Sequence, residues 1–254
     1  MKAIAIAIVL SGPLFGATPS AAIVGGGDAP SEAIARAVVT VVGSRGNFCT
    51  GALLAPDLVL TAAHCVVPGA IYKIVDYSEK PPKLLDTRSV ASHPSFSLQT
   101  LTAHRATADV ALLQLTTPAP AGKAPAPIAA PLTPFRDDSG FTVAGMGVSV
   151  RGDGRTGGVI RSAKLTVTGK PGTLQIRLVD STTQGLRDGL GACTGDSGAP
   201  VFEEQQGRSV IIGVVSWSTA ANNAAGCGGL TGVTPLTLYR DWIVQTARAW
   251  GAKL

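Results

Sequence analysis

Residues in three short segments of the chain could together cleave an acyl bond. In chain order, the segments are Thr61-Ala62-Ala63-His64-Cys65, Asp109-Val110-Ala111-Leu112-Leu113 and Gly195-Asp196-Ser197-Gly198-Ala199-Pro200. A serine hydroxyl is a weak nucleophile at neutral pH, so Ser197 needs an imidazole to take its proton. The imidazole of His64 in turn needs an acceptor on its other nitrogen, which fixes its tautomer and its direction. We therefore predict that His64 is the base, Asp109 the orienting carboxylate and Ser197 the nucleophile.

The surroundings of His64 and Asp109 separate them from the other histidines and aspartates. His64 comes soon after a strand-like run, Leu58 to Thr61, and stands beside Cys65. Asp109 begins an otherwise apolar strand, where a buried carboxylate without donors would be costly. The alternative role for Asp109 is to cap the start of that strand. Four other residues lack comparable surroundings, and we expect them to be structural or exposed: Asp57, Asp76, His93 and His104.

Together with Cys193 ahead of the serine segment, these motifs resemble those of the chymotrypsin/trypsin-like family of serine endopeptidases. The resemblance runs from Ile23 to the C-terminal end. It implies an all-β fold of two antiparallel six-stranded β-barrels with a C-terminal α-helix, and an active site in the cleft between the barrels. It also implies a monomeric enzyme that hydrolyses polypeptide substrates through an acyl-enzyme, with no cofactor and no metal.

The resemblance also assigns roles to glycine and cysteine residues. The backbone N–H groups of Gly195 and Ser197 would form an oxyanion hole, and glycine suits position 195 because the turn needs a conformation that other residues resist. Four cysteines are an even number in a chain that has the features of an exported protein, so we expect two disulfides. Sequence alone allows three pairings. The resemblance selects Cys49–Cys65 and Cys193–Cys227.

Substrate recognition is predicted around Ser216-Trp217-Ser218, which resembles the family's substrate-binding strand and would pair with the peptide backbone. The resemblance puts Gly191 and Ala192 at the base of the specificity pocket, with Ser218 and Gly232 on its walls. No carboxylate occupies that base, so a buried Lys or Arg side chain would lack a charge partner. We therefore expect cleavage after apolar residues.

Two positions depart from the usual pattern of the family. Ser218 stands where glycine is usual, which narrows the pocket mouth and favours medium-sized side chains. Met146, in Gly145-Met146-Gly147, stands where tryptophan is common. We expect altered packing at Met146 rather than lost catalysis.

The segment Ile23-Val24-Gly25-Gly26 matches the N-terminal sequence that members of the family expose on activation. There the freed amine inserts into the body and pairs with the aspartate before the nucleophile, here Asp196. Residues 1–22 have the features of a secretory signal: Lys2, an apolar run and the small residues Ser20-Ala21-Ala22. One cut after Ala22 could therefore both export and activate the enzyme, and the alternative is an earlier cut that leaves a short pro-segment. We expect a secreted or periplasmic protein.

Composition fits many short strands joined by turns. The chain has 254 residues, 45% hydrophobic, with 31 glycines and 17 prolines. Its net charge is +5, and the basic residues are scattered along the chain rather than clustered. This distribution argues against a nucleic-acid partner. Beyond the leader no segment is apolar and long enough to span a membrane, which needs about 20 residues.

Apolar runs bounded by Gly, Pro, Asp or Ser predict two sets of strands. The runs are 37–42, 52–60, 71–75 and 110–115, then 141–146, 159–167, 173–179 and 210–217. Proline-rich residues 117–127 favour an extended linker between the sets. We predict an N-terminal barrel over 23–117, a linker over 118–134, and a C-terminal barrel with its closing helix over 135–254. Leu238, Trp242, Ile243, Thr246 and Trp250 fall on one face of that helix.

Four other interpretations can be weighed against this one. An α/β-hydrolase needs G-x-S-x-G and the order Ser, acid, His, whereas position 199 is Ala and the order here is His, Asp, Ser. The glycine-rich stretch 152–158 lacks the G-K-[S/T] ending of a phosphate loop, so we expect a surface loop. A catalytically silent binding protein on the same fold and an esterase-like acyl hydrolase are the alternatives to an endopeptidase.

Overall fold

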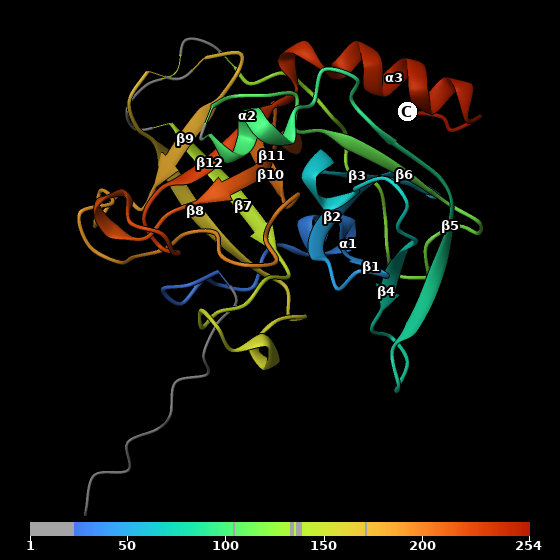
Figure 1. Cartoon of the computed structure of the whole chain (residues 1–254), viewed down its shortest axis with the longest axis horizontal. Helices are drawn as coiled ribbons and strands as arrows, with labels where there is room; N and C mark the ends of the chain where they lie inside the picture. Colours follow the sequence, from blue (N-terminus) through green and yellow to red (C-terminus); the bar gives the residue numbers. More distant parts are fainter. Residues whose placement is uncertain (1–22, 104, 133–134, 136–138, 171) are drawn as a thin grey trace, which may run out of the picture.

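Two closed antiparallel barrels of six strands each make up the computed structural model, which describes residues 23–103, 105–132, 135, 139–170 and 172–254 (Figure 1). The first barrel has the order β1-β2-β3-β6-β5-β4 and the second β10-β11-β12-β9-β8-β7. The predicted fold class is confirmed. The predicted signal at residues 1–22 lies outside the described residues.

The strands of the first barrel are β1 (Val38–Gly43), β2 (Phe48–Ala55), β3 (Leu58–Thr61), β4 (Tyr72–Asp76), β5 (Lys83–Ser92) and β6 (Ala111–Leu115). Those of the second are β7 (Gly140–Gly145), β8 (Arg161–Val167), β9 (Ile176–Val179), β10 (Pro200–Gln205), β11 (Arg208–Ser218) and β12 (Thr231–Pro235). The helices are α1 (Glu32–Ala37), α2 (Leu98–Thr102) and α3 (Arg240–Ala249), with single 3₁₀ turns η1 (Ala63–Cys65), η2 (Gly154–Thr156), η3 (Ala221–Asn223) and η4 (Leu236–Leu238).

The strand pattern differs from the predicted runs at identifiable places. The run 52–60 is two strands, because a turn at Pro56-Asp57 separates β2 from β3. Proline has no N–H for the ladder, and aspartate favours turns. The predicted runs did not include β5, β10 or β12. In β12 the glycine and proline residues are typical of turns, so only pairing with β11 and β9 makes this segment a strand.

Helix α3 is where the apolar spacing predicts it, and it buries Ile243 and Ala247. The two other helices were not predicted, because six and five residues are too few for a helical period to show. Each is stabilised by a serine at its N-terminus: Ser31 accepts from the Ile34 amide, and Ser97 accepts from the Thr100 amide.

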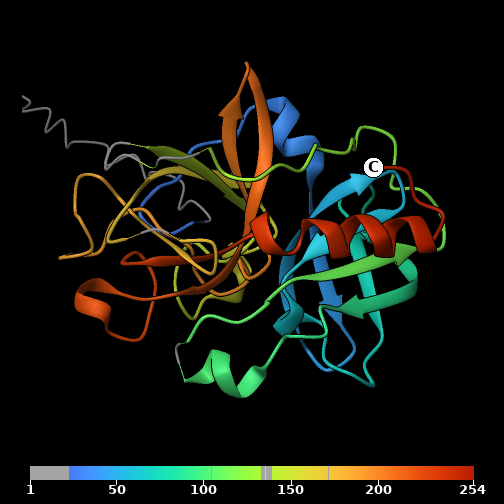
Figure 2. The same ribbon diagram turned by 90° about the horizontal axis from the view of Figure 1, so that it is seen from above.

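One apolar cluster joins the two barrels and α3. It contains Leu54 and Leu60 from the first barrel, Phe202 and Ile211 from the second, and Ile243 from α3. Both views show α3 alongside the first barrel (Figure 2). This shared core fixes how the barrels meet, and the residues described below lie at that junction.

The predicted linker is part of the same junction. The Ala126 amide donates to the Leu53 carbonyl (2.9 Å), and the Ile211 amide donates to the Pro127 carbonyl (2.8 Å). The linker therefore forms backbone hydrogen bonds to both barrels in turn, rather than crossing between them as a free tether.

Candidate active site

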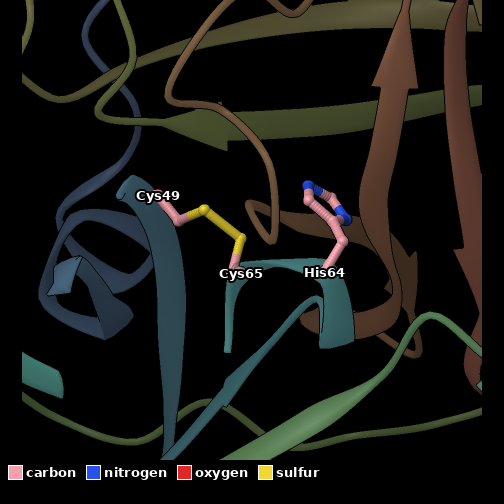
Figure 3. Close-up of side chains that lie close together, drawn as sticks. All are labelled: Cys49, His64 and Cys65. Carbon is pink, nitrogen blue, oxygen red and sulfur yellow. A yellow bond between two sulfur atoms is a disulfide. The ribbon is translucent and has the colours of Figure 1, made fainter. Parts of the chain in front are cut away.

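His64 lies in η1, in the connection from β3 to β4 of the first barrel. A disulfide joins Cys65 to Cys49 on β2, so the turn that carries the imidazole is held against its own barrel. Figure 3 shows the His64 ring beside that disulfide, and one of its ring nitrogens lies within 4.8 Å of both sulfurs. The two sulfurs lie near the ring, but they are bonded to each other and offer no thiolate to a metal.

Asp109 is fully buried, and two residues donate to its carboxylate. The His64 amide donates to Oδ1 (2.9 Å), and His64 Nδ1 lies 2.8 Å from Oδ2. The Ser216 hydroxyl also donates to Oδ2. A buried carboxylate needs such donors, because an unpaired one would be destabilising. These donors come from outside β6, so the carboxylate bonds the His64 ring and Ser216 rather than the strand that follows it.

The turn that carries Ser197 is held by the first barrel. The Thr50 amide donates to the Ser197 carbonyl (2.9 Å), and the Thr50 hydroxyl donates to the Gly195 carbonyl (2.8 Å). Gly195 has φ +93°, a conformation that favours glycine. Gly198 lies so close to β3 that an added Cβ would stand 2.1 Å from Thr61 Oγ1. These contacts place Ser197, Gly195 and His64 around one cavity of about 360 Å³.

Asp196 points away from this cavity into the second barrel. It is fully buried, and its carboxylate accepts from the Gly147 amide (2.8 Å) and the Cys193 amide (2.9 Å). Burial raises the pKa of Asp196 to about 7, although both backbone hydrogen bonds lower it. Within the described residues, no Lys, Arg or His side chain forms an ion pair with Asp196.

The segment Gly145-Met146-Gly147 surrounds the Asp196 carboxylate. An added Cβ would stand 2.0 Å from Asp196 Oδ1 at Gly145 and 2.6 Å from it at Gly147. The Met146 side chain packs into the core shared by the barrels, and its amide donates to Thr50 Oγ1 (3.1 Å). Glycine on both sides therefore makes room for the carboxylate.

The predicted N-terminal segment already lies against the second barrel. Ile23 is fully buried in the apolar cluster of that barrel. Val24 forms a β-bridge with Gly191, and the Gly191 amide donates to the Val24 carbonyl (3.3 Å). A disulfide joins Cys193 to Cys227 and links the segment before Ser197 to the loop before β12. Both disulfides have the pairing that the resemblance selects.

Only some of the predicted substrate-binding residues line the cavity that contains Ser197. Ser218 lines the cavity beside Ser197, whereas Gly191, Ala192 and Gly232 do not. The indole of Trp217 packs on Gly232, where an added Cβ would meet the ring at 2.0 Å. Ala192 is buried, and its amide donates to Thr231 Oγ1 (3.1 Å). Ser216 turns its hydroxyl to Asp109, as described above.

Two residues in and around this cavity were not predicted from the sequence. Thr50 connects β2 to the Ser197 turn, and Arg151 lines the cavity from the loop between β7 and β8. Neither position carries a local signal, because each contact joins segments that only the fold brings together.

Outside this cavity, a larger one of about 660 Å³ lies between α3 and the linker, and it contains none of the three predicted catalytic residues. In the part of the chain that the structure describes, no helix is long and apolar enough to cross a membrane.

Comparison with known proteins agrees with this geometry. The family model described as Trypsin matches residues 23–243, so the chain belongs to the trypsin family. The chain is 30% identical to human Serine protease 56 over 249 residues, and 33% identical to mouse Serine protease 56 over 251 residues. Each match covers 89% of this chain but only 39% of the relative, so the chain spans about two fifths of their length.

Proposed function

We propose that this chain is an exported serine endopeptidase. The observation that carries the proposal is the 2.8 Å contact between His64 Nδ1 and the buried Asp109, on a ring that shares one cavity with Ser197. Membership of the trypsin family supports a hydrolase with polypeptide substrates.

In this proposal Ser197 Oγ attacks the peptide carbonyl carbon while His64 Nε2 takes its proton. The carbonyl oxygen becomes an oxyanion that accepts hydrogen bonds from the amides of Gly195 and Ser197. His64 then gives the proton to the leaving amine, and the carbonyl carbon stays bonded to Ser197 as an ester. Water attacks that ester with His64 again as base, which releases the acid and restores the serine. Asp109 fixes the tautomer of the ring and stabilises the imidazolium.

Asp196 gives a physical reason for activation by a freed Ile23 amine. A buried carboxylate without a cation is unfavourable, as its raised pKa of about 7 reflects. The Ile23 side chain is already buried in the same barrel. A cut before Ile23 would create an ammonium group there, and its pairing with Asp196 would stabilise the turn that carries Gly195 and Ser197.

For the substrate we propose an apolar residue on the acyl side of the cleaved bond. Gly191 and Ala192 offer no charge to a buried Lys or Arg side chain. The Trp217 indole packs on Gly232, which we assign to the wall of the pocket. The position of this ring would therefore set how deep the pocket is. Cleavage dominated by Lys or Arg in a diverse peptide library would refute this preference.

Export is supported by the two disulfides, which persist in oxidising compartments. We propose that the protein is secreted or periplasmic, and that residues 1–22 are the signal that directs it there.

Labelling with a fluorophosphonate probe, together with peptide hydrolysis, tests the proposed function. We expect the enzyme to be labelled at Ser197 and to cleave peptides, and the variant Ser197→Ala to do neither. A protein that is neither labelled nor able to turn over peptides or esters would be a silent binding protein. Turnover of esters but not of matched peptides would identify an acyl hydrolase instead.

A further inference from the structure

Arg151 places a positive charge at the rim of the cavity that contains Ser197 and His64. It is the one lysine or arginine among the described residues that line this cavity, and none of them is an aspartate or glutamate. The chemistry of the site as proposed above does not use this guanidinium. Its position next to the nucleophile nevertheless exposes it to whatever substrate lies there.

The Arg151 side chain is held in place by the segment just before Cys227. Its Nη1 donates to the Ala225 carbonyl (2.8 Å) and lies 3.2 Å from the point where a Cβ on Gly226 would stand. The Gly226 carbonyl accepts from the Ser218 hydroxyl (3.2 Å). Gly226 therefore lies next to both the guanidinium and Ser218, the last residue of the predicted substrate-binding strand.

The loop that carries Arg151 is itself ordered by hydrogen bonds. At its start, the Val148 amide donates to the Thr194 carbonyl (2.9 Å), next to Gly195. The amides of Ser149 and Val150 both donate to Thr156 Oγ1, at 3.1 and 3.2 Å. A side chain on such a loop loses little further backbone entropy when it binds a ligand.

A guanidinium has five N–H donors in a plane, and the described residues take one hydrogen bond from Arg151. A carboxylate is the group that matches the remaining donors. One candidate among the described residues is Asp188, which lines a neighbouring cavity with Arg151, but the two form no ion pair in the described structure. The Asp188 carboxylate instead accepts from the Ala221 amide (3.2 Å).

We propose that Arg151 is a specificity-determining residue that binds a carboxylate of the substrate, on an aspartate or glutamate within two residues of the cleaved bond. The proposal rests on the proposed endopeptidase function and adds a charge preference to it. This charge preference is separate from the apolar preference proposed for the pocket base. The guanidinium lies at the rim and would select a neighbour of the residue that enters the pocket.

Matched peptides test this inference. Each pair has the same apolar residue on the acyl side of the cleaved bond and differs by Asp against Asn, or Glu against Gln, at one of the two positions on either side. At low salt we expect kcat/KM to favour the acidic member about fivefold at one position, since the pair is solvent-exposed. The preference should shrink toward unity as added salt screens the charges. It should also disappear in Arg151→Gln and persist in part in Arg151→Lys.

Arg155→Gln is the matched control for loop charge. Arg155 belongs to the same loop, its side chain is 92% exposed, and it pairs with Asp153 at 3.0 Å rather than lining the cavity. We expect this variant to keep the preference for the acidic peptide. An equal loss in both variants would show a general effect of charge and overturn the role of Arg151, as would equal turnover of all matched pairs by the native enzyme.

Fluorophosphonate labelling separates this inference from the proposed function. Labelling of the native enzyme reports on Ser197 and His64 without any peptide carboxylate, so it tests the nucleophile apart from the charge preference. If the native enzyme cleaves peptides without a preference for acidic members, only the charge preference fails. If it cleaves no peptide at all, the endopeptidase proposal fails and this one fails with it.

Discussion

Ser216 donates its hydroxyl to the carboxylate of Asp109, a residue 107 positions earlier in the chain and in the other barrel. Asp109 thus has a donor on each side, His64 from the first barrel and Ser216 from the second. The contact ties the orientation of the proposed base to the way in which the two barrels meet.

Replacing Ser216 with Ala removes that donor and should lower kcat while KM changes little, because the hydroxyl acts on Asp109 rather than on the substrate. We expect a loss of about tenfold, the equivalent of one hydrogen bond to a charged group. The pH–rate profile of the variant should also shift, since the imidazolium loses part of its support. Ser218→Ala, in which the removed hydroxyl bonds the Gly226 carbonyl, is the control and should leave that profile unchanged.

Replacing Asp109 with Asn should leave the structure in place and lower kcat by about 10⁴, because the amide holds the imidazole in the wrong tautomer. Steady-state peptide hydrolysis measures the loss, and circular dichroism checks the fold. A variant with near-native turnover would rule out the proposed mechanism.

The burial of Asp196 predicts how stability depends on pH before the cut at Ile23. A carboxyl whose pKa is about 7 when folded, against 3.8 as the ordinary value, holds its proton more tightly in the folded state. Its effect on the free energy of unfolding is therefore most favourable below pH 4 and is lost as the pH rises from about 4 to 7. The loss is at most about 4 kcal/mol at 1.36 kcal/mol per pH unit.

Urea unfolding of the uncut chain in a Ser197→Ala background measures this dependence. Adding Asp196→Asn should remove most of the loss of stability between pH 5 and 7.5. After a cut before Ile23 the pairing ammonium should lower the pKa of Asp196, so the loss of stability between pH 5 and 7.5 should disappear. Identical pH dependence with and without the Asp196 change would show that Asp196 is not the source of this loss of stability.

Replacing Gly145 with Ala should destabilise the protein and reduce its activity, because the new Cβ would stand 2.0 Å from Asp196 Oδ1. We expect a loss of about 1–3 kcal/mol in the free energy of unfolding, the usual effect of overpacking. Gly154→Ala is the control, since an added Cβ there meets nothing within 4 Å and the backbone needs no glycine. Equal stability of both variants would contradict the prediction, because it would show that Asp196 can move away from the new Cβ without loss of stability.

The exported enzyme should begin at Ile23, because small residues stand before it where signal peptidase cuts. Intact-mass measurement or Edman sequencing of the active protein checks this. Full activity from a protein that begins upstream would remove the need for a free Ile23 amine. An upstream form that is inactive until trimmed would support a pro-segment instead.

The sequence by itself determined the family, the fold class, the position of α3 and the residues nominated for chemistry. It could do so because His64, Asp109 and Ser197 each stand in a short segment, and the neighbouring positions in each segment also accept few residue types. The residues around Ser197, for example, must allow a turn at Gly195 with φ +93° and a close approach at Gly198. Such requirements are local, so they are visible in a few consecutive letters.

The tertiary structure alone decided the contacts between segments far apart in the chain. The Ser216 hydroxyl bonds Asp109, the Trp217 indole packs on Gly232, and Arg151 lines the cavity. Likewise β12 is a strand only because β11 and β9 pair with it on either side. The physical reason is the same in each case. The direction in which a side chain points follows from barrel register and from how the two barrels pack, and neither is encoded by the residue's own neighbours.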